Sequence, residues 1–251
     1  FYYSPVGFPA SSPELLKACA DRAREVGTRL HTHAAEGWIT IELCKKIHGM
    51  REVELLEKIG FLGPDVLLAH CVQLNEAEVY IISKYRASVA HCPSSNAKLG
   101  NGVAPIVELL WQEVNVGLGC DGAASNNSQD LFTEMKIAAL IQKALHRNAA
   151  VLPAQTVLEM ATIRGAKAIG LENEIGSIEV GKKADIVLIN WKKPNLIPTS
   201  NIISHLVYNT NGSDVSTVIV DGKIIVDNGF FRNFNEVEFL EKAESKLSEL
   251  S

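Results

Sequence analysis

Four residues that could bind a metal or move a proton stand at or just after the ends of short apolar runs. His33 ends one such run and Glu36 follows it three positions later, while His70 and Asp121 end two later runs. Imidazole and carboxylate groups are common zinc ligands, and a bound metal lowers the pKa of water from 15.7 to about 7. The pattern predicts a metal-dependent hydrolase in which His33 and Asp121 hold the metal. Glu36 would then carry the proton, and His70 would steer the attacking water.

Each of these residues also has a purely structural explanation. A histidine at the end of a strand often makes a structural hydrogen bond, and Asp121-Gly122 is typical of a turn. An acidic residue such as Glu36 also favours the first turn of a helix. The joint placement at three strand ends is what favours catalysis. His31 is expected to face the outer helices, on the opposite side of its strand from His33.

The elements that would position these residues alternate between strands and helices. Short β-branched runs predict strands at residues 28–33, 66–70, 87–91 and 116–119. Apolar residues at helical spacing predict helices at residues 13–27, 51–59, 75–85, 104–114 and 129–145. This alternation is typical of an α/β fold with a parallel sheet, and the length of 251 residues suits one (β/α)8 TIM-type barrel. Four strand-plus-helix units within residues 1–170 make only half of such a barrel.

The remaining residues predict two further parts. Within residues 171–232, Val215–Val220 and Lys223–Val226 flank Asp221-Gly222, which is a favourable two-residue hairpin turn. This stretch is expected to form a small β-rich subdomain outside the barrel. Residues 233–251 carry apolar side chains at three- and four-residue steps, which predicts a C-terminal amphipathic helix packed on the body of the protein.

Composition excludes several classes of partner. A formal net charge of -5 gives no broad cationic surface, so nucleic acid and anionic membranes are not expected as main partners. No uninterrupted apolar run reaches the roughly 20 residues that cross a bilayer. The 5 cysteines lack a C-x-x-C pair, which argues against disulfides and indicates a cytoplasmic setting. Cys71 and Cys92 each follow a histidine, but a small buried thiol is the commoner use of such positions than a nucleophile.

Several longer motifs resemble the amidohydrolase superfamily. Within it they are most similar to the aminohydrolases that act on purines, adenosine-type nucleosides and s-triazines, and the resemblance extends from Ser12 to Gly229. The segments that carry it are His31–Glu36, Ala69–Cys71, Ala90–Gly102, Gly119–Ser128 and Gly181–Leu188.

This resemblance implies the position of each strand in the family's barrel and a mononuclear metal site. His33 would be the ligand from the fifth strand and Asp121 the ligand from the eighth, with zinc favoured and iron left open. Glu36 would carry protons, and His70 on the sixth strand would contact the attacked atom or the water. Residues 1–170 would then supply strands five to eight, and residues 171–232 part of the family's composite β-sandwich.

The resemblance also implies which residues contact the substrate. Ser125 and Asn96 fall in loops that line the family's pocket, and His91 closes the seventh strand. The expected reaction is hydrolytic deamination of a small heterocycle, such as a purine or an adenosine-type nucleoside like methylthioadenosine or S-adenosylhomocysteine. An s-triazine chlorohydrolase or aminohydrolase is the alternative.

The family's first strand carries a His-x-His pair that supplies two more metal ligands. His31-Thr32-His33 has that pattern, but the motifs that follow it assign it to the fifth strand instead. Two ligands do not complete a catalytic zinc site, which usually has three from the protein. The chain is therefore expected to be the C-terminal portion of a longer enzyme, with the N-terminal barrel half as its missing partner. An inactive fragment and a homo-oligomer are both left open.

Overall fold

Two β-sheets organise the computed structural model, which describes residues 2–250, with side chains described through residue 247. The first sheet is parallel and its five strands lie in chain order. They are β1 (Tyr2–Tyr3), β2 (Arg29–Ala34), β3 (Val66–His70), β4 (Ser88–His91) and β5 (Val116–Leu118). Because neighbouring strands run the same way, all their carboxyl ends meet at one edge of the sheet.

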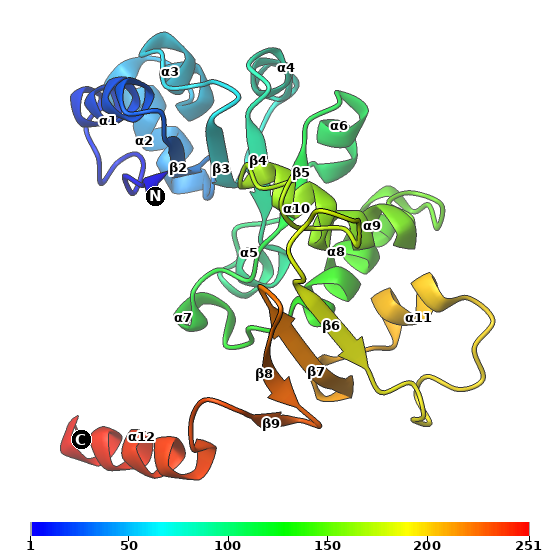
Figure 1. Ribbon diagram of the computed structural model, residues 1–251. Helices are drawn as coiled ribbons and strands as arrows, with labels where there is room; N and C mark the ends of the chain where they lie inside the picture. Colours follow the sequence, from blue (N-terminus) through cyan, green and yellow to red (C-terminus); the bar gives the residue numbers. More distant parts are fainter. Residues whose placement is uncertain (1, 251) are drawn as a thin grey trace.

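Helices connect the parallel strands (Figure 1). Their bounds are α1 (Pro13–Glu25), α2 (Trp38–His48), α3 (Glu52–Lys58), α4 (Glu76–Lys84), α5 (Pro93–Lys98) and α6 (Ile106–Trp111). After β5 come α7 (Ala123–Asn126), α8 (Leu131–His146), α9 (Ala154–Ala161) and α10 (Ile163–Ala168). The fold is thus an α/β fold built on a parallel sheet.

Local chemistry explains where these helices begin. Ser12 caps α1 by accepting a hydrogen bond from the Leu15 N–H, and Pro13 occupies the first helical position, where no N–H is needed. Asn75 and Glu78 form a reciprocal capping box at the start of α4. These are short-range signals that can be recognised in the sequence. The predicted start of α1 agrees with the structure, and the predicted start of α4 is one residue too early.

Side chains on one face of the sheet form the main core with the helices. Leu30, Leu68, Val89 and Val116 come from four adjacent strands and are fully buried in this cluster. Burying such side chains stabilises the fold by roughly 1.5–3 kcal/mol each. The helices must therefore stay on this face, and the other face is left for the site.

The alternation along β2 places two histidines on that other face. Leu30 and Ala34 belong to the buried core, whereas His31 and His33 are only partly buried. Burial, followed by charge on His33 and then on His70, lowers the pKa of His31. The expectation that His31 faces the outer helices is wrong, because side chains two positions apart share a face of a strand.

Several elements depart from the sequence expectation. The short strand β1 pairs in parallel with β2 and was not predicted. Helix α2 begins directly after Gly37 and was also missed, as were α5, α7, α9 and α10. Strand β1 and helix α7 carry too few residues for a periodic pattern. Helix α2 has 11 residues, but no side-chain cap marks its start.

The second sheet is antiparallel and has four strands in chain order. They are β6 (Ile186–Ile189), β7 (Val215–Val220), β8 (Lys223–Asp227) and β9 (Phe230–Phe231). Between β6 and β7 lie α11 (Ile202–Tyr208) and a short 3-10 turn (Gly212–Asp214). Strands β7 and β8 are joined through Asp221 and Gly222, both at positive φ, as a tight hairpin turn requires.

The C-terminal helix α12 (Glu236–Leu250) extends away from the rest of the molecule (Figure 1). All of its described side chains, residues 236–247, are exposed, including Val237, Phe239 and Leu240. The prediction of a helix here is confirmed, but packing against the body is not observed. Amphipathic spacing predicted the body of the protein as the partner of the apolar side, whereas Phe239 contacts Phe234, just before the helix, with 5.9 Å between the ring centroids. Among the described helices, none is long and apolar enough to cross a membrane.

Candidate active site

The register of the parallel sheet brings the predicted residues to one edge. Ala34 is level with His70, Ala69 with Ala90, and His91 with Leu118. His33 and His70 therefore end adjacent strands, and Asp121 follows the end of β5 by three residues. The sequence prediction that these residues gather at strand carboxyl ends agrees with this register.

Four residues at this same edge have a strained backbone conformation. Ala35, His70, Cys71 and Asp121 all have positive φ, between 48° and 71°. Residues other than glycine rarely adopt this conformation, and each such case costs on the order of 1–3 kcal/mol. The strain turns each chain sharply as it leaves its strand, which explains how His70 departs from the alternation of β3.

His33 is oriented by a backbone carbonyl. Its Nδ1–H donates to the Val6 carbonyl oxygen at 2.5 Å, so Nε2 is left with a free lone pair. Gly7, at φ +108°, allows the loop to approach, since a Cβ there would lie 2.7 Å from the His33 carbonyl oxygen. A histidine that ligates a metal usually donates its other N–H in this way. The arrangement suits His33 as a metal ligand through Nε2.

His70 is held in the same tautomer and stacks on His33. Its Nδ1–H donates to Asn96 Oδ1 at 2.9 Å, and its ring lies 5.4 Å from that of His33 at an interplanar angle of 13°. His70 Nε2 lies 3.9 Å from Glu36 Oε1. Neither atom carries a proton when both groups are in their basic forms, so a proton or a water between them would be shared.

Glu36 is fixed by a residue that the sequence prediction missed. Asn101 donates from Nδ2 to Glu36 Oε1 at 3.0 Å, while Gln73 Nε2 donates to the Asn101 carbonyl oxygen at 2.5 Å. The Asn101 N–H also bonds to the Asn96 carbonyl oxygen at 2.9 Å, so one turn holds both His70 and Glu36. Asn101-Gly102 lay inside a recognised motif, but no spacing rule identified the amide as a partner of Glu36.

Glu52 is a second buried group that contacts this loop. Its Oε2 accepts the Ala35 N–H at 2.9 Å, next to Glu36. Burial first, then the charges of Glu78 and Glu36, raise the pKa of Glu52 to about 8, although the Ala35 hydrogen bond works in the opposite direction. Glu52 therefore stays protonated at neutral pH.

Asp121 is prepared as an anion. Ser95 Oγ donates to its Oδ2 and the Gly122 N–H to its Oδ1, both at 2.7 Å. Burial alone would raise the pKa of Asp121, but these two hydrogen bonds, a positive charge on His70 and a hydrogen bond from Ser125 leave it below its usual value. Asp121 is thus a carboxylate at neutral pH, the form that binds a metal.

The three predicted substrate contacts lie in different surroundings. Ser125 is partly exposed in α7, close to Asp121. Asn96 is buried and bonds to His70, and His91 is buried with neither ring nitrogen hydrogen-bonded among the described residues. Burial, and then a charge on His70, lowers the pKa of His91 to about 3, so its ring is neutral. Of the three, Ser125 is the one whose side chain is not buried.

The cysteines near the site are not nucleophiles. Cys71 is fully buried, and burial raises the pKa of its thiol well above the usual value. Burial likewise raises the pKa of Cys92 to about 12, with a further contribution from Asp121. Thiols with such pKa values stay protonated at neutral pH and are inert.

The donor set fits a zinc site but does not close one. His33 offers a free imidazole nitrogen and Asp121 an anionic carboxylate, both typical zinc ligands. Within residues 2–250, no three His, Cys, Asp or Glu side chains are grouped closely enough to hold a metal. At least one more donor is needed for a catalytic zinc site.

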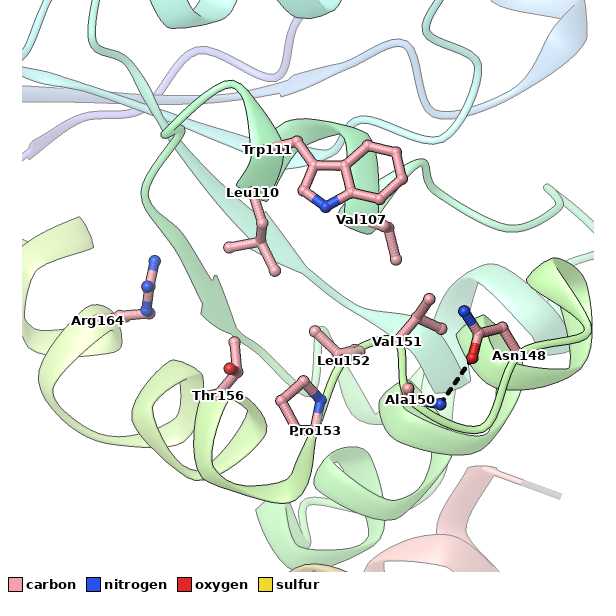
Figure 2. Close-up of a pocket in the computed structure, with 10 residues that line it drawn as sticks. All are labelled: Val107, Leu110, Trp111, Asn148, Ala150, Val151, Leu152, Pro153, Thr156 and Arg164. Carbon is pink, nitrogen blue, oxygen red and sulfur yellow. Dashed lines mark hydrogen bonds between the residues drawn. The ribbon is translucent and has the colours of Figure 1, made fainter.

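A separate pocket of about 380 Å³ lies away from these residues (Figure 2). Val107, Leu110 and Trp111 of α6 line one side, and Asn148 and residues 150–153 with Thr156 and Arg164 line the other. None of the predicted site residues contributes to its wall.

Comparison with known proteins gives two relatives with high similarity. The chain is 45% identical over 248 residues to the 5'-deoxyadenosine deaminase of Methanosarcina acetivorans. It is 43% identical over 236 residues to the 5-methylthioadenosine/S-adenosylhomocysteine deaminase of Moorella thermoacetica. These matches cover 99% and 94% of this chain but only 57% and 55% of the relatives. The chain thus spans little more than half the length of the relatives that it matches.

A solved structure and a family model agree with these relatives. The fold is similar to that of an adenosine deaminase from Xanthomonas campestris with bound zinc, at a TM-score of 0.96 and 30% identity. That match covers 98% of this chain and 56% of the other. The model of the amidohydrolase family matches residues 2–225. On these grounds the chain belongs to the amidohydrolase family.

Proposed function

We propose that this chain is the catalytic C-terminal part of a zinc-dependent deaminase that acts on adenosine-type nucleosides such as 5'-deoxyadenosine, methylthioadenosine or S-adenosylhomocysteine. The observation that carries the proposal is the joint arrangement of His33, His70 and Glu36. The two imidazole rings stack at 5.4 Å, His70 Nε2 lies 3.9 Å from Glu36 Oε1, and the Val6 carbonyl oxygen takes up Nδ1 of His33. The two similar deaminases named above support the choice of substrate.

The proposal extends to the architecture. The five-stranded parallel sheet would be the second half of a (β/α)8 barrel, and the four-stranded sheet part of a composite β-sandwich. A segment outside residues 1–251 would supply the first half of the barrel and the remaining metal ligands. The shares of the relatives covered, 57% and 55%, support this arrangement.

The residues present would divide the reaction between them. His33 Nε2 and the Asp121 carboxylate would hold zinc, which when bound makes hydroxide available at neutral pH. Glu36 would accept a proton from the attacking water and deliver it to the amine as the C–N bond breaks. Ammonia would leave, and a carbonyl would replace the amino group on the ring. His70, through Nε2, would orient the attacking water beside Glu36.

The hydrogen bonds at the site suit these roles. Asn101 occupies one lone pair of Glu36 Oε1, which leaves the second carboxylate oxygen without a partner among residues 2–247. A proton carrier needs one oxygen fixed in place and one accessible. Asn96 and Val6 fix the tautomers of His70 and His33 so that both Nε2 atoms are available.

The test replaces Glu36 by Gln in the whole protein, meaning the form that carries every metal ligand. Glu36→Gln should retain zinc at about one ion per chain and lose at least about 10²-fold in kcat, because general acid–base catalysis contributes 10²–10⁴-fold. Hydrolysis of 5'-deoxyadenosine, methylthioadenosine and guanine should be compared by ammonia release, and that of a chlorinated triazine by both ammonia and chloride release. Full activity of the variant, or zinc-loaded protein that deaminates none of the nucleosides, would contradict the proposal.

A further inference from the structure

Glu134 is a fully buried carboxylate that the proposed reaction does not use. It lies in the first turn of α8 and is 0% exposed. No lysine, arginine or histidine within residues 2–247 forms an ion pair with it. A buried carboxylate without a cation is costly, so its presence requires an explanation.

The side-chain hydrogen bonds that Glu134 accepts within the described residues come from loops beside Asp121. The Ser94 N–H donates to Oε2 at 3.1 Å, and Asn126 Nδ2 donates to Oε1 at 2.8 Å. Ser94 precedes Ser95, whose hydroxyl bonds to the Asp121 carboxylate. Asn126 Nδ2 also donates to the carbonyl oxygen of Cys120, which precedes Asp121. Glu134 thus connects α5, which follows β4, to α7, which follows β5.

The connection acts on Asp121 from two sides. Asp121 has φ +62°, a strained conformation that persists only where its surroundings hold it. Glu134 holds Asn126, which in turn bonds to the backbone carbonyl just before Asp121. Glu134 also holds Ser94, the neighbour of Ser95, whose hydroxyl donates to Asp121.

We propose that Glu134 is a positioning residue of the metal site, holding Asp121 in its ligating geometry and adding negative potential that a bound dication compensates. This inference rests on the proposed function, because it assigns Asp121 as a ligand. It explains why an unpaired carboxylate is buried here, since its countercharge would be the metal. Glu134 itself is separated from the metal by Ser94, Asn126 and the residues that they hold.

The chemistry of the two acceptor bonds identifies the best variant. A carboxylate accepts from both donors, whereas glutamine of the same shape has one acceptor oxygen and turns an N–H group toward the second donor. Glu134→Gln therefore removes the charge and one hydrogen bond without changing the volume.

Gln142 supplies a matched control on the same helix. It is also 0% exposed, and its Nε2 donates to the Ala104 carbonyl oxygen at 2.8 Å, away from Asp121. Gln142→Met should destabilise the fold in a similar way and leave the metal site intact.

The experiment measures zinc affinity by chelator competition, the visible spectrum of the cobalt-substituted protein, and thermal unfolding, all on the whole protein. Glu134→Gln should weaken zinc binding by about 10–100-fold and alter the cobalt bands, as loss of groups that orient metal ligands does. Gln142→Met should change zinc affinity by less than about 2-fold. Unchanged affinity and spectrum in Glu134→Gln, or an equal loss of affinity in both variants, would overturn the inference.

These outcomes are distinguishable from a failure of the proposed function. If the wild-type protein binds zinc but does not deaminate nucleosides, the substrate assignment is wrong and the affinity test of Glu134 still stands. If Asp121→Asn retains full zinc affinity, Asp121 is not a ligand and both proposals fall together.

Discussion

Replacing Glu52 by glutamine should stabilise the protein, and the gain should depend on pH. The folded-state pKa of Glu52 is about 8, well above the ordinary value of 4.5 for the unfolded chain. The folded state therefore binds the Glu52 proton more tightly than the unfolded state. Its contribution to stability is fully present below pH 4.5 and is lost as the pH rises through 8.

The size of the effect follows from the pKa difference. Each pKa unit corresponds to 1.36 kcal/mol, so the wild-type protein should lose up to about 5 kcal/mol between pH 4.5 and pH 8 through this group. The glutamine side chain of Glu52→Gln would be neutral throughout and could still accept the Ala35 N–H through its amide oxygen. The variant should equal the wild type near pH 5 and exceed it by about 3 kcal/mol at pH 7.

Urea unfolding of both proteins at several pH values between 5 and 8.5 measures this difference. Glu25→Gln is the control, because Glu25 pairs with Arg22 on the surface and such pairs contribute about 0–1 kcal/mol. A difference between Glu52→Gln and wild type that stays flat from pH 5 to pH 8 would refute the reasoning, since it would mean that Glu52 does not titrate in this range.

Two other predictions concern the site and the C-terminal helix. Asn101→Leu removes the donor to Glu36 Oε1, so kcat should fall about 10²-fold with little change in KM. Steady-state kinetics on the whole protein measures both constants, and an unaltered kcat would show that Asn101 is not a positioning residue. Deleting residues 236–251 should shift the midpoint of thermal unfolding by less than about 2 °C, because all described side chains from 236 to 247 are exposed; a larger drop in calorimetry would show that this helix packs on a surface.

Much of the fold could be predicted from the sequence because its signals are local. The core strands β2 to β5 and helices α1, α3, α4 and α8 follow from apolar periodicity and from caps such as Ser12 and Asn75. Strand β1 was missed because only two residues form it, whereas α2 and α9 were missed because no side-chain cap marks where they begin. Helix α6 is also shorter than the predicted range 104–114, because it spans Ile106–Trp111.

Residue types and strand ends were enough to nominate His33, Glu36, His70 and Asp121, because parallel strands bring their carboxyl ends to one edge whatever the intervening sequence. Only the tertiary structure decided which partners set their protonation and orientation. Val6, Asn96, Asn101 and Ser95 lie 26 to 65 positions away from the groups that they fix. A hydrogen bond requires two such remote atoms to lie about 2.7–3.2 Å apart, within a few tenths of an ångström, and no one-dimensional pattern encodes that distance.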